Sequence, residues 1–166
     1  MASQHLRDAA DAIDEALQYE SSWQRAEEHR ARFGDGIDYY GTSVGAIRAT
    51  LRDTLRRYPP LEHDDITALS SLLWSAAVYE RRLAAIILLQ GNLSVLVVSD
   101  LTRLEGFLRS SILPDLADVL ARDVIRPLVQ SLDARDRPRA DTVVARWARG
   151  DEPLLSRAEV VVNARS

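Results

Sequence analysis

Apolar residues recur every three or four positions along most of the chain, which is the spacing of amphipathic helices. The clearest example follows Ser43, a good N-cap residue, and its apolar positions are Val44, Ile47, Leu51, Leu55 and Tyr58. Pro59-Pro60 then ends this pattern. No segment alternates with a period of two strongly enough to indicate a half-buried strand. The pattern therefore predicts an all-α fold.

The same spacing predicts the individual helices, joined by short turns. They cover residues 7–20, 22–33, 43–58, 64–74, 77–90, 100–108, 114–132, 139–149 and 154–164. Two segments are predicted to be irregular: the glycine-rich loop GDGIDYYG over 34–41 and the polar linker DARDRPRAD over 133–141. Pro114 fits the first turn of its helix, where a missing N–H does no harm.

The predicted helices fall into pairs of the length found in HEAT-like arrays. The pairs cover residues 43–74, 77–108 and 115–149, so we expect one helical-repeat domain over 1–166, with N-terminal helices and a loop over 1–41 and the helix pairs over 43–166. Sequence repetition between the pairs is weak, which leaves a compact irregular bundle as the alternative.

The last predicted helix has no following helix to pair with. Its apolar positions are Leu154, Leu155, Ala158, Val161 and Val162. A solenoid that stops there lacks a polar capping repeat and would expose an apolar strip. We therefore expect this face to be open to self-association as a homo-oligomer.

Composition sets limits on partners. The chain has 166 residues, 46% of them hydrophobic and 28% charged, as in ordinary globular proteins. Its net charge of −4 argues against a protein that coats nucleic acid indiscriminately. All 21 basic residues are arginine, which reflects either genomic base composition or a local phosphate-binding face. The absence of cysteine excludes disulfides and thiolate metal sites.

The N-terminal residues carry acids and lack the apolar core of a signal peptide. The longest apolar run, LAAIILL over 83–89, is too short to span a membrane, so a cytoplasmic location is expected. His5, His29 and His63 lie scattered among charged residues and are predicted to be solvated. No nucleotide-binding, metal-binding or hydrolase motif is present, so neither a metal nor a cofactor is expected.

Three stretches together are similar to one protein family. They are AEEHRARFGDGIDYYGTSVGAIRATLRD over 26–53, LLWSAAVYERRLAAIILLQ over 72–90 and RWARGDEPLLSRAEVVV over 146–162. Their order and spacing resemble the bacterial DNA alkylation repair enzymes, which are alkylpurine DNA glycosylases built from HEAT-like repeats. The resemblance covers roughly residues 24–163, nearly the whole chain.

The resemblance implies a site and a reaction. The family's catalytic helix opens with Trp-x-x-x-Asp, and the stretch ILPDLAD over 112–118 matches it with Asp118 as the aspartate. This carboxylate would stabilise the oxocarbenium-like sugar left by an alkylated purine and would position water. Arg157 matches the family's phosphate-binding arginine. Arg48 would join them on a concave face that binds alkylated double-stranded DNA.

Two departures from the family are evident. Pro114 occupies the position of the family's tryptophan, which removes an aromatic wall. The sequence also stops at Ser166, before the family's later repeats, so we expect a truncated and divergent relative. The alternative function is therefore a non-catalytic HEAT-like scaffold or interaction module that has lost the glycosylase site.

The candidate residues also have structural explanations. Asp115 suits the first turn of a helix because of the helix dipole. Asp118 lies one turn further on and is either functional or a solvated or arginine-paired residue. Arg157 has the wrong sign for a helix start, which favours a phosphate or an acidic partner. Tyr39 and Tyr40 could stack on nucleic acid or pack the first repeat.

The tryptophans and one charged run are assigned structural roles. Trp74 and Trp147 end apolar helix faces and are predicted to lie in the core, whereas Trp23 would pin the N-terminal helices. The run Glu80-Arg81-Arg82 is predicted to be a salt-bridged helix face rather than a DNA-binding patch.

Overall fold

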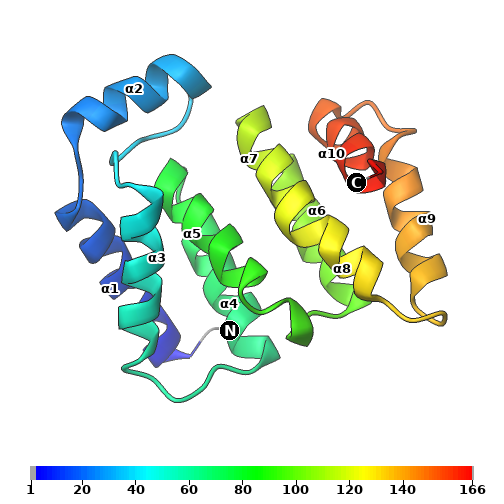
Figure 1. Cartoon of the computed structure of the whole chain (residues 1–166), viewed down its shortest axis with the longest axis horizontal. Coiled ribbons are helices and arrows are strands. Elements are labelled where there is room, and N and C mark those ends of the chain that lie inside the picture. Colours follow the sequence, from blue (N-terminus) through cyan, green and yellow to red (C-terminus); the bar gives the residue numbers. More distant parts are fainter. Residues whose placement is uncertain (1–2, 166) are drawn as a thin grey trace. The chain divides into compact units, whose positions relative to one another are not determined.

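A computed structural model describes residues 3–165 of the chain, shown in Figure 1. Among these residues the regular structure is helical, and the only β-type pairing is an isolated bridge between Asp38 and Val78. The predicted all-α fold is therefore confirmed. The internal contacts divide the chain into two compact units, Met1–Asn92 (unit 1) and Leu93–Ser166 (unit 2). That the chain forms one domain stays a prediction.

Unit 1 contains five α-helices within its described part. They are α1 (Gln4–Tyr19), α2 (Trp23–Phe33), α3 (Val44–Leu55), α4 (His63–Trp74) and α5 (Tyr79–Gln90). Helices α4 and α5 pack along each other, and α1 packs against α3, α4 and α5. The fully buried positions are the apolar stripes of these helices, with Ile13, Leu17, Ile47, Ile66, Leu69, Leu73, Ile86 and Leu89 as the largest aliphatic side chains. Burial of these stripes drives the packing of the unit.

A buried glutamate fixes the loop between α2 and α3. Glu80 on α5 is 0% exposed and accepts hydrogen bonds from the backbone N–H groups of Tyr40 (2.9 Å) and Gly41 (2.8 Å). Gly41 has φ 78°, and a Cβ there would lie 2.0 Å from the carbonyl oxygen of Ser22. Only glycine therefore allows the loop to approach α2 this closely.

The run Glu80-Arg81-Arg82, predicted to be a salt-bridged helix face, has ionic and hydrogen-bonding partners but is largely buried. Arg82 is 5% exposed and donates to the carbonyl of Trp74, while Arg81 forms an ion pair with Asp14 at 3.2 Å. The ion pair of Arg81 agrees with the prediction, whereas the burial was not predicted, because periodicity does not show that a loop and a second helix cover this face.

Unit 2 begins with two short 3-10 turns, η1 (Leu93–Val95) and η2 (Val98–Asp100). Its α-helices are α6 (Leu101–Arg109), α7 (Pro114–Leu120), α8 (Arg126–Ser131), α9 (Arg137–Trp147) and α10 (Pro153–Asn163). Helices α7 and α8 are joined without a break by a π-helical turn, η3 (Ala121–Ile125). Proline begins α7, as predicted, and Pro127 lies just beyond the π turn. Proline has no N–H to donate to the preceding turn, which favours the wider turn at this point.

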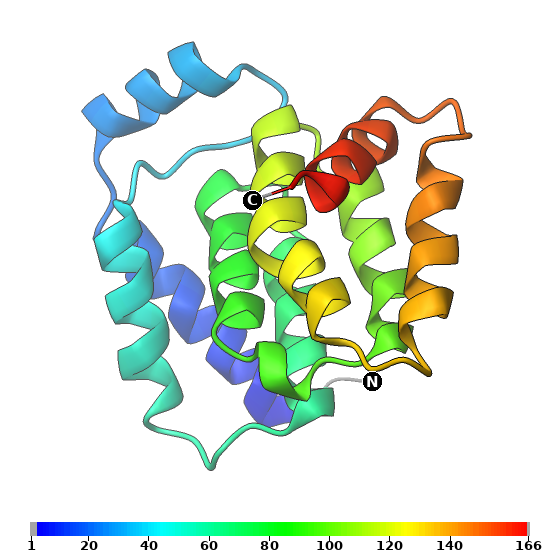
Figure 2. The same cartoon turned by 45° about the vertical axis from the view of Figure 1, so that its right-hand side comes forward.

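The last helix, α10, is not unpaired. It packs against α6, α7, α8, α9 and the π turn, and Figures 1 and 2 both show it between α7 and α9. Leu155, Ala158 and Val162 are buried, whereas Val160 is 66% exposed. The prediction failed because it considered only a following helix and not the helices before it. Self-association of the chain stays a prediction.

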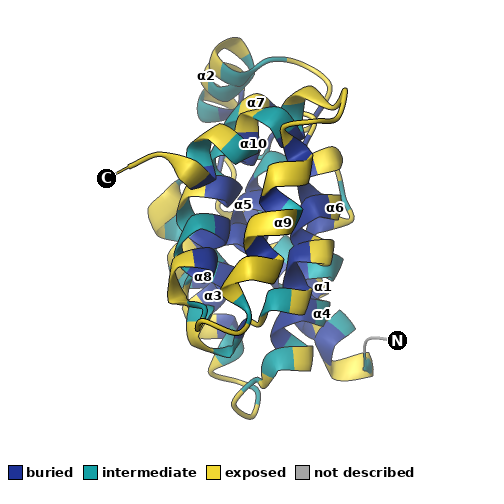
Figure 3. Cartoon of the chain, turned by 90° about the vertical axis from the view of Figure 1, so that its right-hand side faces the viewer, coloured by how far each residue is buried: buried dark blue, intermediate teal, exposed yellow. Residues whose placement is uncertain are grey.

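Two predicted boundaries also shift. Helix α3 ends at Leu55 and not at Tyr58, since residues before a proline avoid the helical region. Helix α9 begins at Arg137, inside the stretch predicted to be a linker, because Pro138 is accepted in a first helical turn. Its buried positions are Ala140, Val144 and Trp147, and its exposed outer face is coloured yellow in Figure 3.

The predicted HEAT-like pairs stay a prediction. The pair over 43–74 corresponds to α3 and α4 in unit 1, and the pair over 115–149 lies within unit 2. The pair over 77–108 has α5 in unit 1 and α6 in unit 2.

Candidate DNA-binding and catalytic site

The two residues singled out in the C-terminal half of the sequence contact each other in unit 2. Arg157 on α10 donates from Nε to Asp118 Oδ1 (2.6 Å) and from Nη2 to Oδ2 (2.7 Å). This is the parallel, two-bond geometry that suits a guanidinium and a carboxylate. The side chains are 52% and 26% exposed, so the pair lies at the surface and a ligand can reach it.

Other charged side chains surround this pair. The hydrogen bond to Asp118 and the charge of this carboxylate raise the pKa of Arg157, and the charge of Asp115 adds to the effect. The pKa of Arg122 is also raised, first by its hydrogen bond to Asp123 and further by the charges of Asp123 and Asp118. Asp118 therefore lies within the electrostatic influence of two guanidinium groups.

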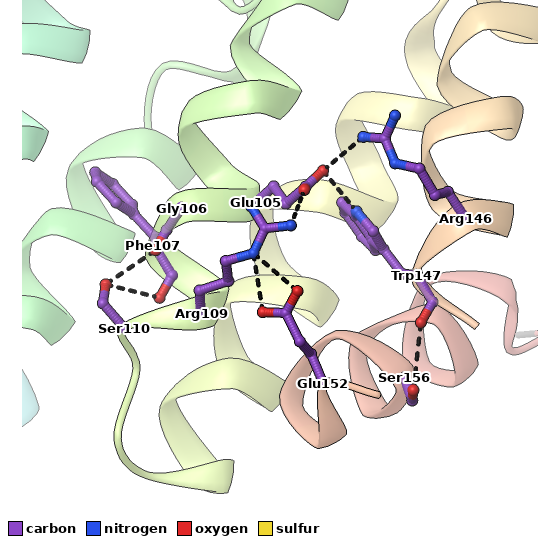
Figure 4. Close-up of polar contacts among 9 residues, drawn as sticks. All are labelled: Glu105, Gly106, Phe107, Arg109, Ser110, Arg146, Trp147, Glu152 and Ser156. Atoms are coloured by element: carbon purple, nitrogen blue, oxygen red, sulfur yellow. Dashed lines mark hydrogen bonds and ion pairs between the residues drawn. The ribbon is translucent and has the colours of Figure 1, made fainter. Parts of the chain in front are cut away.

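A buried network holds the helix that carries Arg157. Glu105 on α6 is 6% exposed and accepts hydrogen bonds from Nε1 of Trp147 (2.8 Å) and Nη2 of Arg146 (3.1 Å) on α9. Arg109, one turn further along α6, pairs with Glu105 at 2.6 Å and with Glu152 at 2.9 Å. Figure 4 shows the Glu105 carboxylate between these donors. Because Glu152 is the residue directly before the first turn of α10, the network ties the start of this helix to α6 and α9.

The partners of Glu105 keep it charged despite its burial. Burial alone would raise its pKa, but the hydrogen bonds from Trp147 and Arg146 and the charges of Arg109 and Arg146 together lower the pKa below the ordinary 4.5. Sequence reasoning missed this residue. The available signal was its position, since Leu101, Leu104, Glu105 and Leu108 share one helix face that is otherwise apolar.

A comparison with models of protein families identifies the family of this chain. The model of the family described as DNA alkylation repair enzyme matches residues 13–165, nearly the whole sequence. The chain belongs to this family. Membership supports a role in alkylation repair and suggests DNA as the substrate, and it confirms the resemblance seen in the sequence. A search of curated proteins gave no match.

The other residues singled out in the sequence lie at the start of α7 in unit 2 and on α3 in unit 1. Asp115 lies in the first turn of α7, as predicted, with Pro114 before it and Leu113 as the N-cap. Pro114, the position that the resemblance matches to the family's tryptophan, is exposed and places a small apolar ring at the surface. Arg48 lies in unit 1, exposed on α3. With Arg52, Ile87, Gln90 and Gly91 it lines a surface hollow of about 460 Å³. Its predicted place on one face with Asp118 stays a prediction.

The two adjacent tyrosines have structural partners in unit 1. Tyr39 is 8% exposed and donates its hydroxyl to the Gly34 carbonyl at 2.8 Å. Tyr40 donates to Asp14 at 2.8 Å, and burial together with this hydrogen bond raises its pKa to about 12. These contacts correspond to the packing alternative. DNA stacking by either residue stays a prediction.

Two further assignments are wrong, and one is confirmed. Trp23 is 81% exposed, so it does not hold the N-terminal helices together. The face of α2 that packs inward carries Ala26 instead. His29 is not solvated, because its ring lies among aromatic rings and its Nδ1 is 3.4 Å from Glu80. Trp74 and Trp147 are in the core, 4% and 1% exposed.

The described residues form neither a metal-binding cluster nor a membrane-spanning helix. Within 3–165, no three His, Asp or Glu side chains cluster in a way that could hold a metal ion. No helix in that range combines the length and the apolar character that crossing a membrane requires.

Proposed function

We propose that the protein binds alkylated duplex DNA and hydrolyses the N-glycosidic bond of an alkylated purine. The observation that carries this proposal is the surface pair of Asp118 and Arg157, brought together from α7 and α10. The sequence resemblance matches these two residues to the family's aspartate and arginine. No metal or cofactor is invoked in the proposed reaction.

Asp118 acts on the sugar in this proposal. An alkylated purine carries a positive charge, so when the bond from C1′ to the base nitrogen breaks, the bonding electrons leave with the base, which departs neutral. Positive charge then develops on the deoxyribose. A fixed carboxylate near C1′ stabilises this charge, and it can accept the proton of the water that adds to C1′. The products are the free base and an abasic site.

Arg157 can bind phosphate without releasing Asp118. A guanidinium has five N–H donors, and only the Nε and one Nη2 hydrogen point at the carboxylate. The remaining donors lie along another edge, where a phosphate oxygen pair can bind. Arg157 would thus orient the carboxylate and fix the DNA backbone at the same time.

A second function is favoured by one specific observation, the proline at the family's aromatic position. Without an aromatic wall, the surface could bind DNA but fail to hold the damaged nucleotide for hydrolysis. The protein would then be a non-catalytic HEAT-like module that retains DNA binding.

The deciding experiment compares wild-type protein with Asp118→Asn and with Asp115→Asn as a matched control. Release of methylated adenine and guanine from alkylated duplex DNA is measured by chromatography, and duplex binding is measured by fluorescence anisotropy over a range of salt. Asp118→Asn should lower base release by about 10²–10³-fold, the size of effect seen when one electrostatic stabiliser is lost. It should leave binding unchanged or tighter, because a negative charge beside Arg157 disappears. Asp115→Asn should change release by only a few fold.

The outcomes separate the two functions. Base release by wild-type protein that Asp118→Asn abolishes supports the glycosylase. Salt-sensitive binding with no release by wild-type protein contradicts hydrolysis and supports the non-catalytic module. Absence of binding even at low salt contradicts both.

A further inference from the structure

Ile112 has an unusual backbone conformation directly before α7. Its φ is 67°, and it is the only non-glycine residue within 3–165 with a positive φ. The N–H of Leu113 bonds to the carbonyl of Ser111 at 2.7 Å, so Ile112 is the centre of a three-residue turn. This γ-turn with positive φ is rare and strained, and a β-branched side chain makes the strain worse.

The neighbours of Ile112 force this conformation. Ser111 is 0% exposed and donates its hydroxyl to the Phe107 carbonyl at 2.9 Å, which fixes the end of α6. Leu113 is 2% exposed, and Pro114 starts α7 immediately afterwards. The chain must therefore reverse within one residue, and glycine or asparagine would do this with less strain.

Burial does not explain an isoleucine at this position. Its side chain is 44% exposed, so much of its apolar surface stays in water. Strain of this kind persists where the surrounding structure imposes it, and it often marks a functional contact. The fold accounts for the turn but not for the residue in it.

The position lies close to the candidate site. Two extended residues and one helical turn separate Ile112 from Asp118, so their Cα atoms are at most about 13 Å apart. This is close to the width of the DNA major groove, about 12 Å. A duplex with a sugar at Asp118 is therefore within reach of Ile112.

We infer that Ile112 is an apolar DNA contact, which supplies part of the wall that Pro114 does not provide. The inference rests on the proposed function. Aliphatic side chains pack on sugars and can wedge against base steps. An exposed isoleucine at a fixed turn, on the segment that leads into the helix of Asp118, has the chemistry to contact the apolar face of a deoxyribose or base.

The test uses Ile112→Gly and Ile112→Asn in the full chain, with Val97→Asn as control. Val97 is also 44% exposed in unit 2 but has an extended backbone with φ −127°. Both Ile112 variants should unfold at higher urea concentration, because either residue accepts positive φ with less strain. They should nevertheless bind duplex DNA about tenfold more weakly, in line with loss of a buried aliphatic contact. Val97→Asn should leave DNA affinity unchanged.

Each other result overturns the inference. If the stabilised Ile112 variants bind DNA like wild type, Ile112 is only a strained turn residue. If they are less stable than wild type, the strain argument is wrong. If wild-type protein does not bind duplex DNA at low salt, the proposed function fails and this contact fails with it. Weak binding by the variants alone does not affect the proposed function.

Discussion

Each unit contains a glutamate buried on a helix, and the two glutamates bind different kinds of partner. Glu80 in unit 1 accepts two backbone N–H groups of the loop between α2 and α3. Glu105 in unit 2 accepts side-chain donors from Trp147 and Arg146 and pairs with Arg109. Both are less than 10% exposed, so burial alone does not distinguish them.

The two glutamates differ in whether their hydrogen-bond donors can reach water when the carboxylate is removed. The amide groups of Tyr40 and Gly41 are fixed by the backbone, and Gly41 is buried against Ser22. The side chains of Arg109 and Arg146 are 49% and 65% exposed, so their guanidinium groups can turn to water. Glu80 should therefore contribute more to stability than Glu105, although Glu105 has more charged partners.

Glu80→Ala should have the largest effect. It leaves the N–H groups of Tyr40 and Gly41 without an acceptor, which should lower the free energy of unfolding by about 4 kcal/mol, roughly 2 kcal/mol for each. Urea unfolding measures the loss, and hydrogen exchange should accelerate most within residues 1–92. Glu80→Gln keeps one carbonyl acceptor and should lose about half as much. Equal losses for the two variants would show that the second hydrogen bond contributes nothing.

Glu105→Gln should have a smaller effect that depends on pH. At neutral pH the neutral amide still accepts from Trp147, so the loss should be about 1–2 kcal/mol. Because the folded protein lowers the pKa of Glu105, its charged form stabilises the fold above the ordinary value of 4.5, and this stability disappears as pH falls through the folded pKa. Urea unfolding from pH 7 to pH 3 should show a steeper loss for wild type than for Glu105→Gln. Parallel pH curves would contradict the role of the charge.

Tyr40→Phe should have the smallest effect and separates side chain from backbone in the Glu80 loop. It removes one half-buried hydroxyl bond to Asp14, at about 1 kcal/mol. The pKa of Tyr40 rises from 10.0 to about 12 on folding, so wild type should lose stability as pH rises from 10 to 12. Thermal unfolding over this range should show a weaker loss for Tyr40→Phe. An identical alkaline loss in both proteins would exclude Tyr40 as its source.

The helices and much of the core were predictable because their signals are local. Ser43 caps α3 as expected, with its hydroxyl accepting from the N–H of Ala46 at 3.2 Å. The positions of Trp74 and Trp147 followed from apolar stripes. Trp23 was misassigned because the spacing of apolar residues in α2 does not reveal which helix, if any, covers its side chain.

The candidate site was predictable only in part. Family resemblance identified Asp118 and Arg157, but residues 39 positions apart give no sign in one sequence that they form a two-bond ion pair. The backbone strain at Ile112 also depends on the tertiary structure and not on the local sequence. It arises because Ser111 and Leu113 are both buried, which an isolated tripeptide would not require.

The π turn has a consequence for register. Buried residues of the helix from α7 to α8 repeat every four positions, as Leu116, Leu120, Val124 and Leu128 and again as Ala117, Ala121, Ile125 and Val129. A straight α-helix turns about 100° per residue, so such a stripe would wind around it by about 40° at each repeat. The wider turn reduces this winding, and it acts like a one-residue insertion that the helix absorbs. Deleting one residue from 121–125 would rotate Asp118 relative to the buried face of α8. The direction in which the Asp118 carboxylate points therefore depends on the number of residues in the π turn as well as on side-chain identity.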